Sequence, residues 1–125
     1  EKDKLRDLDG VMYPLGMMSD NDKIDHDFEA LFRINNANFL SIVRITQELL
    51  KAHNTEKKFS IVGFGSVASA LGRNENSIYS ASKRALNSYF ESLSIFGVKN
   101  NVNVQYYILN KNLYSMEWVF LVLYE

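Results

Sequence analysis

The sequence contains no cysteine among its 125 residues, which excludes a disulfide-stapled scaffold and thiol catalysis. Without cysteine, a zinc site would need His26, His53 and carboxylates, and the two histidines, 27 positions apart, match no recognised ligand spacing. We therefore expect no metal site. No stretch approaches the roughly 20 apolar residues of a membrane-spanning helix, and no basic-then-apolar leader opens the chain. These absences favour a cytoplasmic location without a membrane partner.

A strong charge of either sign is also missing. The 14 basic residues nearly balance the 15 acidic residues and give a formal net charge of −1. Phosphate-binding domains are usually strongly basic, so we expect no nucleic-acid partner. The hydrophobic share of 46% is typical of one globular domain. Because the chain begins at Glu1 and not at a methionine, we expect it to be a piece of a longer polypeptide.

With only six glycines and one proline, the sequence has few turn signals, so its regular elements are expected to be long. Short apolar runs rich in β-branched residues predict strands, and apolar residues at steps of three and four predict helices. The predicted order is a strand at 8–13, a helix at about 27–52, a strand at 59–64, a helix at about 77–96 and a strand at 102–109.

Two details of the helices follow from the same pattern. We expect Gly97 to cap the second helix. The buried face of the first helix is predicted to consist of Phe28, Phe32, Asn35, Phe39, Ile42, Thr46 and Leu49.

Helical connections between successive strands imply parallel strands and right-handed crossovers. The fold class is therefore α/β, a three-layer doubly wound parallel sheet of the Rossmann type, present in part within a single domain over residues 1–125. The apolar run 118–124 permits two interpretations. It is either a further buried strand or a sequence that has lost its normal continuation.

Three polar residues are predicted to meet at the carboxyl ends of the strands, where open parallel sheets bind ligands. Ser66 follows the second strand, and Tyr79 and Lys83 lie one turn apart on the next helix. An ammonium about 4 Å from a phenol, at an effective dielectric near 20, favours the phenolate by about 4 kcal/mol before desolvation is counted. This would lower the tyrosine pKa toward the range of general acid–base catalysis, while the serine hydroxyl holds a substrate carbonyl. Such a set suits carbonyl–alcohol interconversion with a nicotinamide cofactor.

The same residues carry a family resemblance. Gly65-Ser66-Val67-Ala68, followed by Tyr79-Ser80-Ala81-Ser82-Lys83, resembles the short-chain dehydrogenase/reductase (SDR) family. That family has a serine at a strand end, a tyrosine 13 residues later and a Tyr-x-x-x-Lys helix, and all three conditions are met. The resemblance implies an oxidoreductase that moves hydride between NAD or NADP and a small carbonyl or alcohol substrate.

The resemblance also implies a role for each site residue. Tyr79 would be the acid/base, Lys83 would lower its pKa and bind the nicotinamide ribose, and Ser66 would orient the carbonyl. In this family the helix before the serine strand usually holds an asparagine after Val or Ile, which Ile34-Asn35 matches. Asn35 would then distort the helix and anchor a proton-relay water, whereas we expect the neighbouring Asn36 and Asn38 to be exposed.

The resemblance covers about residues 9–110, and residues 111–125 diverge. The family's Asn-Asn-Ala-Gly corresponds to 11–16 and retains only Gly16, and its later Pro-Gly corresponds to Leu109-Asn110 and is absent. The Gly-rich phosphate turn and the substrate lobe are missing altogether. We therefore interpret the sequence as a core fragment and expect weak or no NAD(P) affinity from this chain alone.

Two other interpretations stay open. In one, the chain is a catalytically silent fragment or a structural subunit that forms a homodimer through its two long helices, as the family commonly does. A row of small side chains on the second helix would allow this approach: Ala81, Ala85, Ser88 and Ser92. In the other, 63–68 forms the phosphate turn of a Rossmann unit, which requires a helix to open at Ser66.

Overall fold

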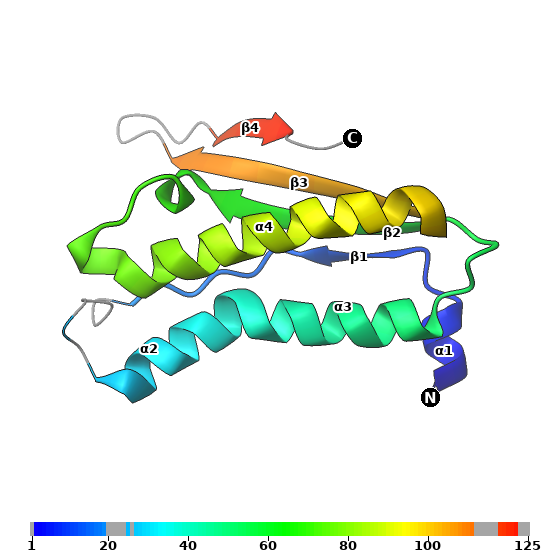
Figure 1. Ribbon diagram of the computed structural model, residues 1–125, viewed down its shortest axis with the longest axis horizontal. Coiled ribbons are helices and arrows are strands. Elements are labelled where there is room, and N and C mark those ends of the chain that lie inside the picture. The colour runs from blue at the N-terminus through cyan, green and yellow to red at the C-terminus, as the bar shows by residue number, and fades with distance from the viewer. Residues whose placement is uncertain (1, 20–24, 26, 112–117, 123–125) are drawn as a thin grey trace.

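The computed structural model describes residues 2–19, 25, 27–111 and 118–122 (Figure 1). Its helices and strands alternate along most of the chain as the sequence predicts. In chain order the elements are α1 (Lys2–Arg6), β1 (Gly10–Tyr13), α2 (Phe28–Asn35), the π-helical turn η1 (Asn36–Leu40), α3 (Ser41–Ala52), β2 (Phe59–Ser66), the 3₁₀ turns η2 (Val67–Ser69) and η3 (Asn74–Asn76), α4 (Ser77–Asn100), β3 (Val102–Lys111) and β4 (Trp118–Val122).

The four strands form one sheet in the order β1-β2-β3-β4. β1, β2 and β3 are parallel, with Met12 beside Val62 and Val62 beside Gln105. This confirms the predicted α/β architecture with a parallel, Rossmann-like sheet. β4 pairs antiparallel with β3, so the strand interpretation of the apolar tail holds for Trp118–Val122. Residues 123 and 124 of that run lie outside the described part.

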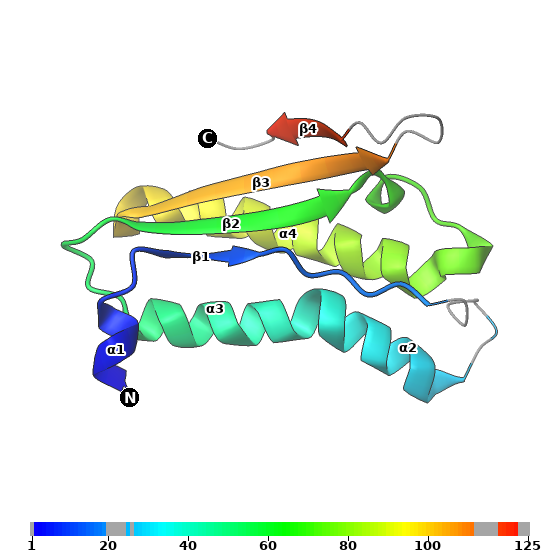
Figure 2. The same ribbon diagram turned by 180° about the vertical axis from the view of Figure 1, so that it is seen from behind.

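The long helices pack on one face of the sheet. Alternate residues of β2, from Phe59 to Gly65, are buried against them, and the residues between are half-buried on the opposite face. Figure 2 shows the described strands from that opposite side, with α4 behind them. A hollow of about 260 Å³ on that face is lined by Met12, Val62, Phe64, Gln105 and Tyr107. The described residues thus form two layers of the predicted three.

The first long helix runs without a break from α2 through η1 to α3, within the predicted range. Its predicted buried face is correct at Ile42, Thr46 and Leu49 but wrong at Phe28 and Phe32, which are 76% and 49% exposed. A π-helical turn holds one extra residue compared with an α-helical turn. The side chains of α2, which precede it, are therefore rotated about the helix axis relative to those of α3. The buried residues before and within that turn are therefore Ala30, Ile34 and Asn38.

The second long helix, α4, continues past the predicted end and stops at Asn100. Its C-cap is Asn101, which adopts the left-handed conformation with φ 58°. The predicted cap, Gly97, lies inside the helix and is buried. Glycine is needed there because any side chain would collide with the carbonyl oxygen of Val102. The glycine thus permits close packing of α4 on the start of β3.

The alternative phosphate turn at 63–68 is wrong. Gly63 and Gly65 lie within β2 and face the helix side, where added side chains would collide with the rings of Phe90 and Tyr106. Only the short η2 follows Ser66, and the next α-helix opens at Ser77. The glycines therefore make room for core aromatic rings. Among the described helices, none combines the length and apolar character needed to cross a membrane.

Candidate functional site

Ser66 is the last residue of β2, at the carboxyl edge of the sheet. Its hydroxyl oxygen accepts a hydrogen bond from the backbone N–H of Ala68 at 3.2 Å and so caps η2. Its carbonyl accepts a bond from the Ser69 hydroxyl at 2.7 Å. Among the described residues the Ser66 hydroxyl hydrogen has no acceptor, so this group is held in place and still able to donate.

Tyr79 and Lys83 lie one turn apart on the first two turns of α4, as the four-residue spacing predicts. Tyr79 is half-buried, whereas Lys83 is only 3% exposed. The Lys83 Nζ lies 6.0 Å from the centre of the Tyr79 ring. At that distance an ammonium is within range of an electrostatic interaction with the ring.

Two strand ends meet at the Lys83 ammonium. Nζ donates a hydrogen bond of 2.8 Å to the carbonyl oxygen of Leu15, in the segment after β1, and one of 3.2 Å to that of Phe64, near the end of β2. Phe64 is two residues before Ser66 on the same strand. Lys83 therefore brings Tyr79, the end of β2 and the segment after β1 together. An ammonium has three N–H donors, and these bonds use two of them.

Burial lowers the pKa of Lys83 from its usual value near 10.5 to about 8. The cause is desolvation, which disfavours the charged form of a side chain removed from water. The two carbonyl acceptors act in the opposite direction, because they favour the protonated form. At neutral pH the protonated form of Lys83 still predominates, so the site holds a positive charge that is almost completely shielded from solvent.

Asn38 is a site residue that sequence reasoning missed. It lies in the π-helical turn η1, is fully buried, and binds the backbone of Met17 twice. Its side-chain oxygen accepts from the Met17 N–H at 2.6 Å, and its side-chain nitrogen donates to the Met17 carbonyl at 2.7 Å. Met17 is two residues after Leu15, whose carbonyl binds Lys83. Asn38 thus fixes the segment that supplies one of the two Lys83 acceptors.

The sequence assigned a different role to Asn35, a helix distortion that anchors a proton-relay water. The structure places Asn35 half-buried at the end of α2, directly before the π-helical turn. Among the described residues its side chain makes no hydrogen bond. The expectation of exposure is correct for Asn36 and wrong for Asn38. Regular helical periodicity predicts that Asn35 lies on the same face as the core residues of α3. The π-helical turn shifts this periodicity, so that Asn38 lies on the buried face instead. The sequence gives only a partial indication that Asn38 is buried: it is four residues from both Ile34 and Ile42, which are buried apolar residues.

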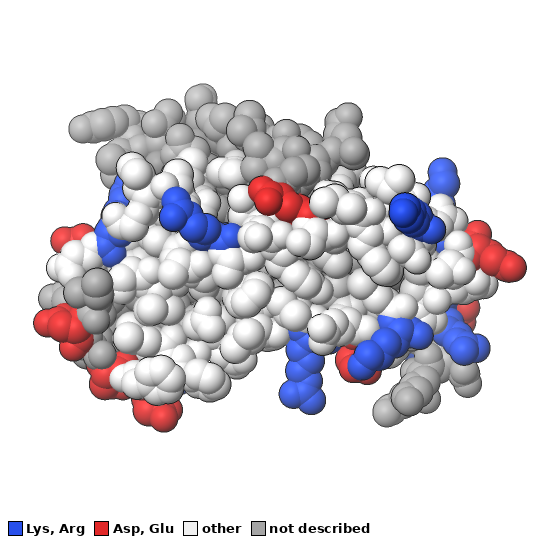
Figure 3. All heavy atoms as spheres, in the orientation of Figure 1, with Lys and Arg blue, Asp and Glu red and all other residues white. Residues whose placement is uncertain are grey.

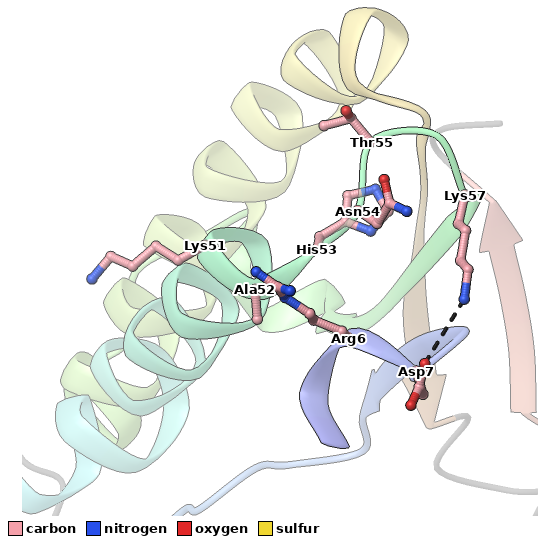
Figure 4. Close-up of a pocket in the computed structure, with 8 residues that line it drawn as sticks. All are labelled: Arg6, Asp7, Lys51, Ala52, His53, Asn54, Thr55 and Lys57. Atoms are coloured by element: carbon pink, nitrogen blue, oxygen red, sulfur yellow. Dashed lines mark ion pairs between the residues drawn. The ribbon is translucent and has the colours of Figure 1, made fainter. Parts of the chain in front are cut away.

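A hollow lies at the opposite, amino-terminal edge of the sheet and does not include these residues. Its volume is about 490 Å³, and it lies beside α1, the end of α3 and the loop that follows (Figure 4). An exposed ion pair of 3.8 Å between Lys57 and Asp7 spans one side of it. No group of three metal-ligating side chains occurs within the described part of the chain, and His26 lies outside that part.

Replacement of Asn38 tests whether its two bonds hold the segment after β1. We expect Asn38→Ala to lower the free energy of unfolding by about 1–3 kcal/mol, since it leaves a backbone donor and acceptor unpaired. Asn38→Asp keeps an acceptor for the Met17 N–H and removes the donor to the Met17 carbonyl. We therefore expect the protection of the Met17 amide from exchange to lie between that of the wild type and that of Asn38→Ala. Urea denaturation and amide hydrogen exchange at Met17 measure both. Asn36→Ala, at an exposed neighbouring position, is the control and should change stability by less than about 0.5 kcal/mol. Equal effects at 36 and 38 would contradict the assignment.

The pH dependence of stability tests the burial of the Lys83 charge. The pKa of lysine is about 10.4 in an unfolded chain and about 8 here, so between these values the unfolded chain binds more protons and a rise in pH favours folding. Relative to Lys83→Met, which does not titrate, we expect the wild-type chain to gain about 2 kcal/mol between pH 7.5 and 9.5. Unfolding in urea at a series of pH values measures the difference. A constant difference would show that the folded-state pKa is not lowered.

The sequence and the fold of this chain are both similar to those of known proteins. The sequence model of the family described as short chain dehydrogenase matches residues 2–109. A bulky-bulky ketone specific alcohol dehydrogenase from Comamonas testosteroni superposes with a TM-score of 0.75 at 20% identity, over 86% of this chain and 44% of that one. A short-chain dehydrogenase from Burkholderia cenocepacia, solved in complex with NADP, superposes with a TM-score of 0.73 at 17% identity, over 84% of this chain and 44% of that one.

A short-chain dehydrogenase/reductase from Vibrio parahaemolyticus gives a TM-score of 0.68 at 19% identity, over 79% of this chain and 48% of that one. The chain therefore spans less than half the length of these solved proteins. A search among curated proteins found no match. The solved structures share the fold, and the family model covers most of the sequence: the chain belongs to the short-chain dehydrogenase family.

Proposed function

We propose that this chain supplies the catalytic face of an NAD(P)-dependent oxidoreductase, which moves hydride between a nicotinamide and a carbonyl or alcohol. The observation that carries the proposal is the position of Lys83. Its buried ammonium lies one turn from Tyr79 and binds the carbonyl of Leu15, after β1, and that of Phe64, two residues before Ser66 in β2. A phenol, an ammonium and a hydroxyl at the carboxyl edge of a parallel sheet have the chemistry of carbonyl reduction.

Each side chain has a role that its surroundings support. Ser66 accepts a hydrogen bond from Ala68, so its own hydroxyl hydrogen can be donated to a substrate carbonyl oxygen. Tyr79 would give its phenolic proton to that oxygen during reduction and take it back during oxidation. The Lys83 charge would stabilise the negative charge that the Tyr79 oxygen acquires when it gives up the proton.

The nicotinamide cofactor was expected from the sequence, and the described residues fit one end of it. When bound, it supplies or accepts the hydride. Lys83 has one N–H beyond the two that bind Leu15 and Phe64, and a ribose hydroxyl could accept it. The described residues contain no Gly-rich phosphate turn, since Gly63 and Gly65 pack against core rings. The binding of the pyrophosphate would therefore depend on residues other than these.

We propose that Asn38 supports the site through the backbone, while the proton-relay role expected of Asn35 stays a prediction. Asn38 does not reach the reacting atoms through any described contact, and it acts on Lys83 through the segment between Leu15 and Met17. It is therefore a positioning residue, and its side chain ties the first long helix to the site.

Calorimetric titration and a hydride-transfer assay test the proposal. We expect the 125-residue chain to show no saturable binding of NADPH or NADH at micromolar concentrations, because its described residues form no Gly-rich phosphate turn. In a longer polypeptide that contains this segment together with a phosphate turn, Tyr79→Phe should lower turnover by about 10²–10⁴-fold and leave cofactor binding nearly unchanged. Tyr107→Phe, on the opposite face of the sheet, is the matched control and should retain turnover. Survival of turnover in the Tyr79→Phe variant would remove the acid/base role.

A second proposal concerns a partner, and an exposed row of small residues favours it. Ala81, Ser88 and Ser92 are exposed on one side of α4, and Ala85 between them is half-buried. Figure 3 shows the surface over α4 as largely uncharged, with a few isolated charged groups. Small side chains let a second helix approach closely, so we propose that two copies of the chain pair through the long helices.

The molar mass in solution tests this pairing. We expect light scattering to give twice the mass of the chain for the wild type and a single chain mass for Ser88→Arg, which places a large charge in the row. Glu56→Arg, in the exposed loop before β2, is the control and should remain paired. A wild-type chain that stays monomeric at high micromolar concentration would exclude the homodimer.

A further inference from the structure

This inference rests on the proposed function and concerns Arg84, the residue after Lys83 on α4. Its side chain is exposed, and it reaches the loop that follows β2. Nε donates a hydrogen bond of 2.9 Å to the carbonyl oxygen of Ser69, and Nη2 donates one of 2.7 Å to that of Ala70. Among the described residues Arg84 forms no ion pair, so both of these bonds go to neutral carbonyls.

The two carbonyls lie at the end of the 3₁₀ turn η2, where the backbone leaves acceptors free. The N–H of Ala70 binds the carbonyl of Val67, and this bond closes the turn. The carbonyls that come later in such a turn have no N–H partner within it. A guanidinium group is a planar fork with several N–H donors, so one arginine binds both carbonyls and holds the turn against α4.

The same turn fixes Ser66, the residue that precedes it. The hydroxyl oxygen of Ser66 accepts a hydrogen bond from the N–H of Ala68, and its carbonyl accepts one from the hydroxyl of Ser69. Both partners are residues of η2, and Arg84 binds the carbonyl of the second one. A movement of η2 away from α4 would therefore carry the Ser66 hydroxyl with it.

Lys83 and Arg84 thus hold the end of β2 at two points. Lys83 binds the carbonyl of Phe64, two residues before Ser66, and Arg84 binds the turn directly after Ser66. Consecutive residues of a helix point in directions about 100° apart, so the two contacts approach from different sides. Because Tyr79 lies on the same helix, the position of the Ser66 hydroxyl relative to the phenol depends on both contacts.

We propose that Arg84 is a positioning residue, which orients the Ser66 hydroxyl toward a substrate carbonyl by clamping η2 to α4. Its guanidinium group is occupied by the backbone and acts on the reacting atoms only through Ser66. Hydrogen bonds from a guanidinium group are charge-assisted and therefore stronger than those between neutral groups. Since the contact is at the surface, its loss should disturb the turn more than the core.

The geometry of the turn in the 125-residue chain provides the first test. Arg84→Met removes the guanidinium group and keeps an unbranched stem. We expect amide hydrogen exchange at Ala68 and Ala70 to become about tenfold faster, since charge-assisted bonds to the turn are lost. The Hα–Hβ couplings of Ser66 should change from those of one rotamer to averaged values, and NMR measures both quantities.

Two further variants provide the comparison. Arg84→Lys retains a charged donor without the fork, so its exchange rates should lie between those of the wild type and Arg84→Met. Arg44→Met, at an exposed arginine of α3, is the matched control and should leave the turn unchanged. Unchanged exchange and unchanged Ser66 couplings in Arg84→Met would overturn the proposal.

Turnover in the longer polypeptide that contains this segment and a phosphate turn provides the second test. We expect Arg84→Met to lower kcat by about tenfold, because a misplaced hydroxyl orients the carbonyl less well, and to leave cofactor binding nearly unchanged. In a Ser66→Ala background the same substitution should lower kcat by less than about twofold, because the group that Arg84 positions is already missing. Equal losses in both backgrounds would show that Arg84 does not act through Ser66, which would overturn the proposal.

The two tests separate a failure of this inference from a failure of the proposed function, since the first needs neither cofactor nor hydride transfer. If Arg84→Met alters the Ser66 couplings while Tyr79→Phe retains turnover, the proposed function is wrong and the clamp on Ser66 stands. If Tyr79-dependent turnover is observed while Arg84→Met changes neither turnover nor the Ser66 couplings, only this inference is wrong.

Discussion

The structure depends most on one buried cation. The Lys83 ammonium leaves water and binds two backbone carbonyls, one after β1 and one near the end of β2. A carbonyl is a neutral partner, so the desolvation cost is only partly offset, and the lowered pKa records the remainder. An arrangement chosen for stability alone would not bury a lysine in this way. The proposed function accounts for this position, because that function places a positive charge beside Tyr79.

The support of this lysine extends across the molecule. Asn38 fixes Met17, Met17 and Leu15 belong to the same short segment, and Leu15 binds Lys83. The π-helical turn is what points Asn38 at Met17, since a regular helix would place Asn35 on that side. The local departure from α-helical geometry is therefore part of the site, consistent with the frequent occurrence of π turns at functional positions. Beneath it, the Tyr13 hydroxyl and the Thr46 hydroxyl share a buried hydrogen bond of 2.8 Å that ties β1 to α3.

Much of the fold could be predicted from the sequence because its signals are local and strong. The strands around Ile61 and Val104 are short apolar runs, and the spacing of Tyr79 and Lys83 fixes them on one helix face. The errors have a common cause in interactions between distant residues. No local pattern announces that the carbonyl of Val102 excludes a side chain at Gly97, or that a π turn rotates Phe28 outward. The pairing of Asn38 with Met17 likewise joins residues 21 positions apart.

The junction between α4 and β3 has a mechanical consequence. A single left-handed residue, Asn101, separates the helix from the strand, and Gly97 lets the helix end lie directly on Val102. That end of α4 is anchored to the sheet and cannot slide along its axis without dragging β3. The end that bears Tyr79 is joined instead to the loop of residues 70–76. Near Tyr79 the helix is held by side chains instead, since Lys83 binds the carbonyls of Leu15 and Phe64, so the two ends of α4 are joined to the sheet by different kinds of contact.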